Sequence, residues 1–271
     1  MNTPIIVNIL TRTSGRPQGF NNCYLSVKKQ TYNKIRHIVS SDNLKNIFYL
    51  KDLEVDVVEV PFLFDGSKEG LTDQYGNIYS PHNLYCNILL EQVKEGWIVF
   101  LDDDDCLIHD KVVEEIVETI KQVDEDTLII WQMRYPNGKL VPSNQAILKN
   151  EIQINNIGSP CFAFHYKYKS LAQWDEFKRS DFRFVKQLSQ IIPKKLFLNE
   201  VYIQINNFGD FGRRNDLDLK SKLPFTFYKN WFWYLIPKYH YTILGIKLFH
   251  RWTYRNFVKK MIAKISRIFK Y

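Results

Sequence analysis

The sequence lacks the signatures of several large protein classes. Its four cysteines, Cys23, Cys86, Cys106 and Cys161, are scattered, and no two lie at metal-ligand or redox spacing. Isolated thiols of this kind favour a reducing compartment and buried small side chains. There is no P-loop, no Gly-x-Gly-x-x-Gly fingerprint and no Ser-His-Asp order, so kinase, dehydrogenase and hydrolase functions find no support.

Long apolar runs are absent as well. No stretch of ~20 uninterrupted apolar residues is available to span a bilayer. The N-terminal run MNTPIIVNIL holds only about six apolar residues before polar ones resume, which is short for a signal-peptide core and fits a first β-strand better. We therefore expect a cytoplasmic protein.

Acidic residues are missing from one part of the chain. Residues 221–271 contain 11 Lys or Arg and no Asp or Glu. The net charge of +8 belongs to this tail, because the first 220 residues hold 26 basic and 29 acidic side chains. We expect the tail to bind an anionic partner, whereas the charge of the main domain gives no such indication.

Strand-like and helix-like segments alternate over about the first 135 residues. This alternation predicts an α/β fold with a mostly parallel sheet and helices on both faces. Residues 61–82 have no clean period and are predicted as a long loop, and the pattern from 142 to 220 is less regular. Strands are predicted at 5–10, 35–40, 55–60, 97–101 and 128–133, with a strand or hairpin at 196–205; helices are predicted around Phe20, Tyr24 and Val27, at 83–94, after an Asp110 cap, and at 181–191.

Polar residues follow three of the predicted strands. Thr11, Arg12 and Thr13 follow the first, Asp42 the second, and Asp102–Asp105 the fourth. Because ligands of such sheets bind beyond the carboxyl ends of the strands, we expect these clusters to share one rim.

The four adjacent aspartates are costly to hold together. Two carboxylates ~5 Å apart repel by roughly 3 kcal/mol at an effective dielectric of about 20. A divalent Mg²⁺ or Mn²⁺ removes that penalty, prefers carboxylate oxygen and also holds the diphosphate of a leaving group. The alternative is a solvated acidic loop in which Asp105 or Asp110 caps the next helix.

The segment VFLDDDDCL at 99–107 resembles the strand and Asp-x-Asp motif of inverting GT-A glycosyltransferases of family 2. NILTRTSGRP, VKKQTY (27–32) and IRHIVSSDN (35–43) are similar to the nucleotide-binding half of that fold, in the same order. The resemblance covers about residues 4–135 and continues more loosely to about 216. It implies a GT-A domain over 1–220, with a nucleotide-sugar half to about 135 and an acceptor half over 136–220.

The resemblance also implies roles for individual residues. Asp102 and Asp104 match the two Asp of the motif and would hold Mn²⁺ or Mg²⁺, with Asp104 the more direct ligand and Asp102 nearer the ribose. Asp103 occupies the variable middle position of the donor site. The other residues implied to hold the nucleotide diphosphate sugar are Thr11, Arg12, Thr13, Asp42 and Asn87, the last matching a recurrent Asn in the helix before the metal strand.

An inverting transfer needs a general base for the acceptor hydroxyl. The family supplies an Asp or Glu at a helix start, and Asp181 in WDEFKRSDFRF holds that place, although the usual Glu-Asp pair is missing. The alternative is that Asp181 is only an N-cap. In NNFGDFGRRND, Arg213 or Arg214 is expected to close over the diphosphate, unless this loop is a solvated turn. Trp174 stacks on a sugar or packs in the core, and Arg16 reaches a phosphate or lies exposed.

The tail is dense in aromatic residues over 225–257 and shows helical spacing over 247–270. A basic amphipathic helix of this kind is typical of a peripheral protein at an anionic membrane, here the inner face. Docking on the catalytic domain or on a second subunit is the alternative. Nucleic-acid binding is the least supported reading.

The sequence therefore predicts a metal-dependent inverting glycosyltransferase that moves a sugar from a nucleotide diphosphate sugar to a glycan or lipid-linked acceptor. Two other functions remain open. One is a non-catalytic module that binds an anionic partner or membrane. The other is a sugar nucleotidyltransferase, whose Lys-containing Gly-rich N-terminal loop is absent here.

Overall fold

The computed structural model describes residues 4–206 and two short strands, 241–243 and 246–249. The chain divides into two compact units, Met1–Leu217 and Asp218–Tyr271. In the second unit β10 (Tyr241–Ile243) and β11 (Ile246–Phe249) pair antiparallel. The helix predicted from 247 is thus wrong at its first residues, because Ile246–Phe249 form the strand β11. The rest of the predicted tail helix and Arg213 lie outside the described residues.

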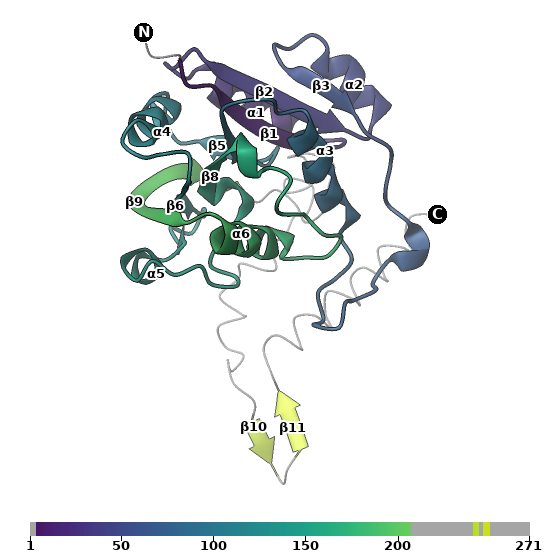
Figure 1. The fold of residues 1–271 in the computed structure, drawn as a ribbon. Coiled ribbons are helices and arrows are strands. Elements are labelled where there is room, and N and C mark those ends of the chain that lie inside the picture. The colour runs from purple at the N-terminus through teal and green to yellow at the C-terminus, as the bar shows by residue number, and fades with distance from the viewer. Residues whose placement is uncertain (1–3, 207–240, 244–245, 250–271) are drawn as a thin grey trace. The chain divides into compact units, whose positions relative to one another are not determined.

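A mostly parallel sheet forms the centre of the first unit, as predicted (Figure 1). The strand order is β3-β2-β1-β4-β8-β6-β9-β5, and β7 pairs with β6. β8 runs antiparallel to both of its neighbours, and β5 runs antiparallel to β9. The strands are β1 (Val7–Thr13), β2 (Ile35–Ser41), β3 (Asp56–Glu59), β4 (Trp97–Phe100), β5 (Cys106–Leu107), β6 (Thr127–Arg134), β7 (Leu140–Val141), β8 (Phe162–His165) and β9 (Lys194–Gln204).

Central strands β4 and β8 are buried along their whole length, which explains why their sequences are apolar without alternation. Gly96 makes the entry into β4 possible. Its φ of +83° suits glycine, and a Cβ there would lie 2.3 Å from the carbonyl oxygen of Ile6. The aspartate run follows β4 directly and therefore emerges from the middle of the sheet.

Helices form where apolar side chains recur on one face. In α4, Val113, Ile116, Val117 and Ile120 are buried as predicted. The predicted Asp110 cap is wrong, because Lys111 holds the N-cap position without a side-chain cap and the Asp110 carbonyl accepts the Thr31 N–H instead. The helices are α1 (Pro17–Lys28), α2 (Leu44–Leu50), α3 (Tyr85–Glu91), α4 (Val112–Ile120), α5 (Asn144–Leu148) and α6 (Ser180–Ile191).

Four aromatic side chains join β4, β8 and α6. The Phe100 ring lies 5.0 Å from Trp174 and 5.8 Å from Phe184, and Trp174 stacks on Phe184 at 4.9 Å. Phe162 completes the cluster, 6.1 Å from Phe100. Trp174 is only 3% exposed and packs within this cluster, which is one of the two alternatives that the sequence left open. This aromatic cluster packs the first part of α6 against the end of β4.

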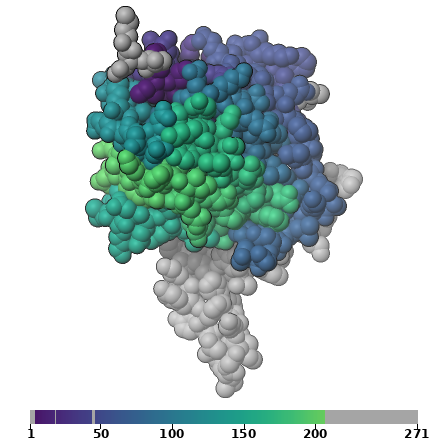
Figure 2. Space-filling view, viewed as in Figure 1, coloured from purple at the N-terminus to yellow at the C-terminus, as the bar shows by residue number. Residues whose placement is uncertain are grey.

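The second half of the unit packs tightly against the first. In Figure 2 the teal and green residues meet the purple and blue ones without a break on this face. The predicted loop at 61–82 contains two 3-10 turns, Gly66–Lys68 and Pro81–Leu84, and the region predicted as a strand or hairpin at 196–205 is the single strand β9. Among the residues described, no helix combines the length and the apolar character needed to cross a membrane.

Candidate active site

A cavity of about 520 Å³ opens where β1 and β4 end. Its wall combines the aspartate run with residues far away in the sequence. Acidic and basic side chains both line it, so that charges of both signs face the same space. The lining residues that carry the argument below are Arg12, Arg16, Asn83, Asp102, Asp103, Asp104, Tyr135, Ser159, Trp174, Lys178, Arg179 and Asp181.

Asp102 is held by two hydrogen bonds. Its Oδ1 accepts from Arg12 Nη2 at 3.2 Å, and its Oδ2 accepts from Ser159 Oγ at 2.7 Å. Arg12 comes from the end of β1, and Ser159 from the segment before β8. The carboxylate is therefore oriented before any ligand binds.

Asp103 and Asp104 share the guanidinium of Arg16. Arg16 Nη2 pairs with Asp103, and Nη1 lies 3.3 Å from Asp104 Oδ2. Asp103 is 1% exposed, and burial raises its pKa to about 7, which Arg16 opposes. Arg16 thus supplies the positive charge that the crowded carboxylates need, and its side chain faces the cavity.

Asp105 has a different environment from the other three. It does not line the cavity, and its Oδ1 accepts the backbone N–H of Asn206 at 3.1 Å. Burial raises its pKa well above the usual range. Asp105 therefore ties the aspartate run to the end of β9.

The residues that line the cavity fit a divalent cation that takes only one or two ligands from the protein. Asp102 and Asp104 both face the cavity, but no group of three or more His, Cys, Asp or Glu side chains converges anywhere in residues 4–206. Mg²⁺ typically uses one or two carboxylates and completes its shell with water and substrate phosphates. Asp102 and Asp104 therefore suit a cation whose coordination is completed by water and substrate phosphates. They do not suit a cation that is held by protein ligands alone.

Arg12 lines the cavity and contacts both of its sides through three side chains. In addition to Asp102 it donates to Asn83 Oδ1 at 2.7 Å, and its guanidinium lies 5.9 Å from the centre of the Trp174 ring. It therefore contacts both the aspartate run and the segment leading to α6. The family resemblance implies that Arg12 contacts the nucleotide, which stays a prediction, and the structure places its side chain between Asp102 and Trp174.

Asp181 lies across the cavity in the first turn of α6. Its Oδ1 accepts the N–H of Phe182 at 2.8 Å. Burial raises the pKa of Asp181 to about 6, with Asp102 raising it further and Arg12 and Arg183 lowering it. At neutral pH the carboxyl is mostly ionised yet accepts a proton readily, which suits a general base. Arg179, not Asp181, holds the N-cap position.

Several residues implied by the resemblance lie outside the cavity wall. Thr11 is fully buried and bonds His37 Nε2 at 3.0 Å, and Thr13 is 5% exposed. Asp42 accepts from the Tyr85 hydroxyl at 2.8 Å. Asn87 uses both ends of its amide on the backbone of one residue, Trp174. Their predicted contacts with the nucleotide remain predictions.

The cavity also contains residues that sequence reasoning missed. Asn83, Tyr135, Ser159, Lys178 and Arg179 all line it. Only a tertiary contact brings Ser159 to Asp102, 57 positions away, so no local pattern marks it. Asn83 lies in the 3-10 turn Pro81–Leu84 directly before α3, which is the one local signal that was available.

No protein-family model matches the chain, and no curated protein matches it in sequence. Its fold is similar to solved glycosyltransferase structures. Residues 1–349 of TarS from S. aureus, in complex with UDP, superpose with a TM-score of 0.56 at 15% identity, over 74% of this chain and 60% of that one. Another crystal structure of S. aureus TarS gives a TM-score of 0.54 at 13% identity, over 74% of this chain and 36% of that one.

A structure from a second organism shows the same likeness. The mannosyltransferase PcManGT from Pyrobaculum calidifontis, in complex with GDP-Man and Mn²⁺, gives a TM-score of 0.52 at 12% identity, over 74% of this chain and 57% of that one. The chain thus spans less than two thirds of each of these proteins. The likeness confirms the predicted GT-A-like fold, whereas membership of family 2 stays a prediction.

Proposed function

We propose that this chain is a glycosyltransferase that moves a sugar, with inversion, from a nucleotide diphosphate sugar to an acceptor hydroxyl. One observation carries the proposal: a single cavity brings Asp102 and Asp104, at the end of β4, to face Asp181, at the start of α6. Carboxylates suited to a cation and a carboxyl suited to a proton therefore face one another across a space of substrate size. The GT-A-like fold supports the same reaction, since TarS binds UDP-GlcNAc and PcManGT binds GDP-Man with Mn²⁺.

Each side of the cavity has its own part in the reaction. Asp104 and Asp102 would hold a divalent cation, Mn²⁺ or Mg²⁺, and such a cation would supply positive charge to the leaving diphosphate. Arg12 and Arg16 orient the carboxylates and add positive charge beside the phosphates. Asp181 removes the proton of the acceptor hydroxyl as its oxygen bonds to the anomeric carbon and the bond from that carbon to the diphosphate breaks.

The acceptor and the place of the reaction follow from the tail. We propose that the basic residues of 221–271 bring the enzyme to an anionic membrane at its cytoplasmic face, where a glycan or lipid-linked acceptor is presented. Arg213 closes over the diphosphate in this proposal.

The test is transfer from a panel of nucleotide diphosphate sugars with Mn²⁺, first screened by the shift in melting temperature. Asp104→Ala and Asp181→Ala are each expected to abolish transfer, while Asp110→Ala, an exposed aspartate outside the cavity, leaves it intact. Asp181→Ala should keep donor binding, since the base acts on the acceptor. Sugar transfer or donor hydrolysis that survives both changes would contradict the proposal. Formation of a nucleotide sugar from a sugar phosphate and a nucleoside triphosphate would identify a nucleotidyltransferase instead.

A further inference from the structure

The segment between β3 and α3 has an ordered turn at its centre. Thr72 and Ile78 form an isolated antiparallel bridge. Asp73 closes the turn, because its Oδ1 accepts the backbone N–H groups of Tyr75 and Asn77 at 2.9 and 2.8 Å. Its Oδ2 accepts from Asn77 Nδ2 at 2.7 Å. Asn77 is only 5% exposed, so the direction of its amide is fixed.

This hairpin, residues 72–79, lies alongside the segment that leads into α6. The N–H of Ser80 donates to the carbonyl of Glu176 at 2.6 Å, and the N–H of Lys178 donates to the carbonyl of Ile78 at 2.8 Å. Between these bonds, Tyr79 and Phe177 pair antiparallel, with ring centres 6.2 Å apart. The hairpin therefore acts as a short added strand beside residues 176–178.

Arg179 comes next and has a left-handed backbone, with φ of 65° and ψ of 23°. Residues other than glycine disfavour this conformation, which persists where the surroundings hold it. Arg179 Nη1 donates to Asn77 Oδ1 at 3.1 Å. From the other side, Arg183 Nη2 donates to the carbonyls of Lys178 and Phe177 at 2.9 and 3.1 Å.

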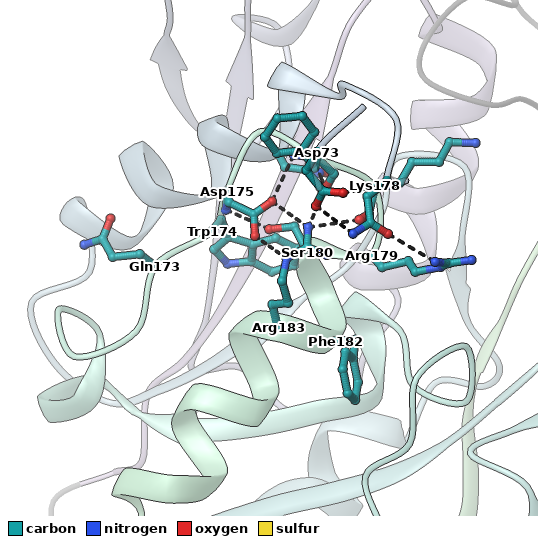
Figure 3. A network of polar contacts seen from close by, with 12 residues as sticks. Asp73, Gln173, Trp174, Asp175, Lys178, Arg179, Ser180, Phe182 and Arg183 are labelled. Carbon is teal, nitrogen blue, oxygen red and sulfur yellow. Dashed lines mark hydrogen bonds and ion pairs between the residues drawn. The ribbon is translucent and has the colours of Figure 1, made fainter. Parts of the chain in front are cut away.

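Arg183 is itself anchored. Its guanidinium forms two bonds with the Asp175 carboxylate, and the N–H of Asp175 donates to Ser180 Oγ at 2.7 Å. Figure 3 shows Asp175, Ser180 and Arg183 pointing toward one another at the start of the helix. Hydrogen bonds with Asn77 and from Arg183 therefore hold the backbone around the strained residue Arg179, and the Asp175 carboxylate holds Arg183 in turn.

The left-handed backbone of Arg179, at the N-cap position, determines where α6 begins. Asp181 follows Arg179 by two residues, and both line the cavity, whereas Asn77 does not. A right-handed Arg179 would send the chain before α6 in another direction and separate Asp181 from the segment that the hairpin holds. The direction of the Asp181 carboxyl therefore depends on the conformation of Arg179.

We propose that Asn77 is a positioning residue: through Arg179 it holds the left-handed turn that aims Asp181 into the cavity. The inference rests on the proposed function in one respect only, namely that Asp181 takes part in the reaction. Because Asn77 does not line the cavity, its removal changes the catalytic step and leaves the donor contacts in place.

The first measurement is kcat and the donor KM of the full chain carrying Asn77→Ala. A small displacement of a reacting group lowers rate steeply, so we expect kcat to fall roughly 10- to 100-fold while the donor KM stays within about twofold. Asn33→Ala, the same change at an exposed asparagine between α1 and β2, should keep the original kcat. A lower melting temperature with unchanged kcat would show that Asn77 is merely structural and overturn the proposal.

The second measurement uses the backbone preference of glycine. Arg179→Gly tolerates a positive φ without strain, whereas Arg179→Ala does not. Added to Asn77→Ala, the glycine change should restore part of kcat, and the alanine change should restore none. If both changes lower activity equally and raise the acceptor KM, Arg179 contacts the substrate directly and the proposal is wrong.

The third measurement separates this inference from the proposed function. If no donor supports transfer by the original chain, the proposed function fails, but the Asp181 carboxyl can still be titrated by ¹³C NMR. Asn77→Ala should lower its pKa from about 6 toward the ordinary range, because a loosened turn admits water. Arg12, Asp102 and Arg183, the charged groups around Asp181, are unchanged in this variant. An unaltered titration would overturn the inference.

Discussion

At the scale of single residues, the aspartate run is four different groups. Asp102 is oriented by Arg12 and Ser159, Asp103 and Asp104 face Arg16, and Asp105 ties to Asn206. The sequence predicted a charged cluster at the end of a strand, and the unequal roles that it gave to the four residues stay predictions. It did not reveal the counter-charge of Arg16, because an arginine in a turn is ordinary by composition and only the fold brings it to the run.

The buried Asp103 carboxyl predicts how stability depends on pH. Its folded pKa of about 7 lies above the unfolded value near 3.8, so between these pH values the folded state binds the extra proton. Stability therefore decreases as pH rises through this window, by at most about 1.4 kcal/mol per pH unit. Melting temperatures should be higher at pH 5 than at pH 7.5, and Asp103→Asn should reduce the difference. An equal slope in that variant would assign the effect to another group.

Asp181 predicts the pH dependence of the reaction. A base must be ionised, and its pKa of about 6 means that kcat/KM should fall about tenfold for each pH unit below 6. The measurement is the pH profile of kcat/KM at saturating Mn²⁺. An acid limb near pH 4 would show a carboxyl open to water and would remove Asp181 as the buried base.

At the scale of elements, α3 and the segment before α6 are joined through Asn87. Its amide accepts the N–H of Trp174 and donates to the Trp174 carbonyl, both at 2.9 Å. Asn87→Ala leaves both groups without these partners and should cost about 1–3 kcal/mol of unfolding free energy. Urea denaturation measures this loss, and calorimetry with nucleotide should give an unchanged affinity. Weaker nucleotide binding at full stability would instead support the donor-site role that the family resemblance implies.

The sequence predicted the helices and strands in which apolar residues recur with a clear period. The strands that became β1, β2, β4 and β6 and the inward face of α4 appear close to where they were expected. β8 and the hairpin of residues 72–79 were not predicted. Residues distant in the chain hold them in place, and no local pattern marks them. The same reason explains why Asp181 was predicted and Asn77 was not: a helix start has a local pattern, and a partner 102 positions away has none.

At the scale of the whole molecule, the charge is divided between a mildly acidic main domain and a basic tail. We expect the full chain to co-sediment with vesicles that contain anionic lipid and to be released by salt. Changing Lys259, Lys260 and Lys264 to Glu should abolish sedimentation while leaving transfer to a soluble acceptor intact. Sedimentation that survives this triple change would show that the tail is not the membrane contact.

The bond between Asp105 and Asn206 makes the chain just after β9 mechanically continuous with the aspartate run. Asn206 Nδ2 also holds the carbonyl of Asp104 at 2.9 Å. Tension on the polypeptide just after Asn206 would therefore act directly on the carboxylates that we propose hold the cation. A fluorophore or force probe attached near this point would report on the occupancy of the cavity, and a rigid fusion placed there would disturb it.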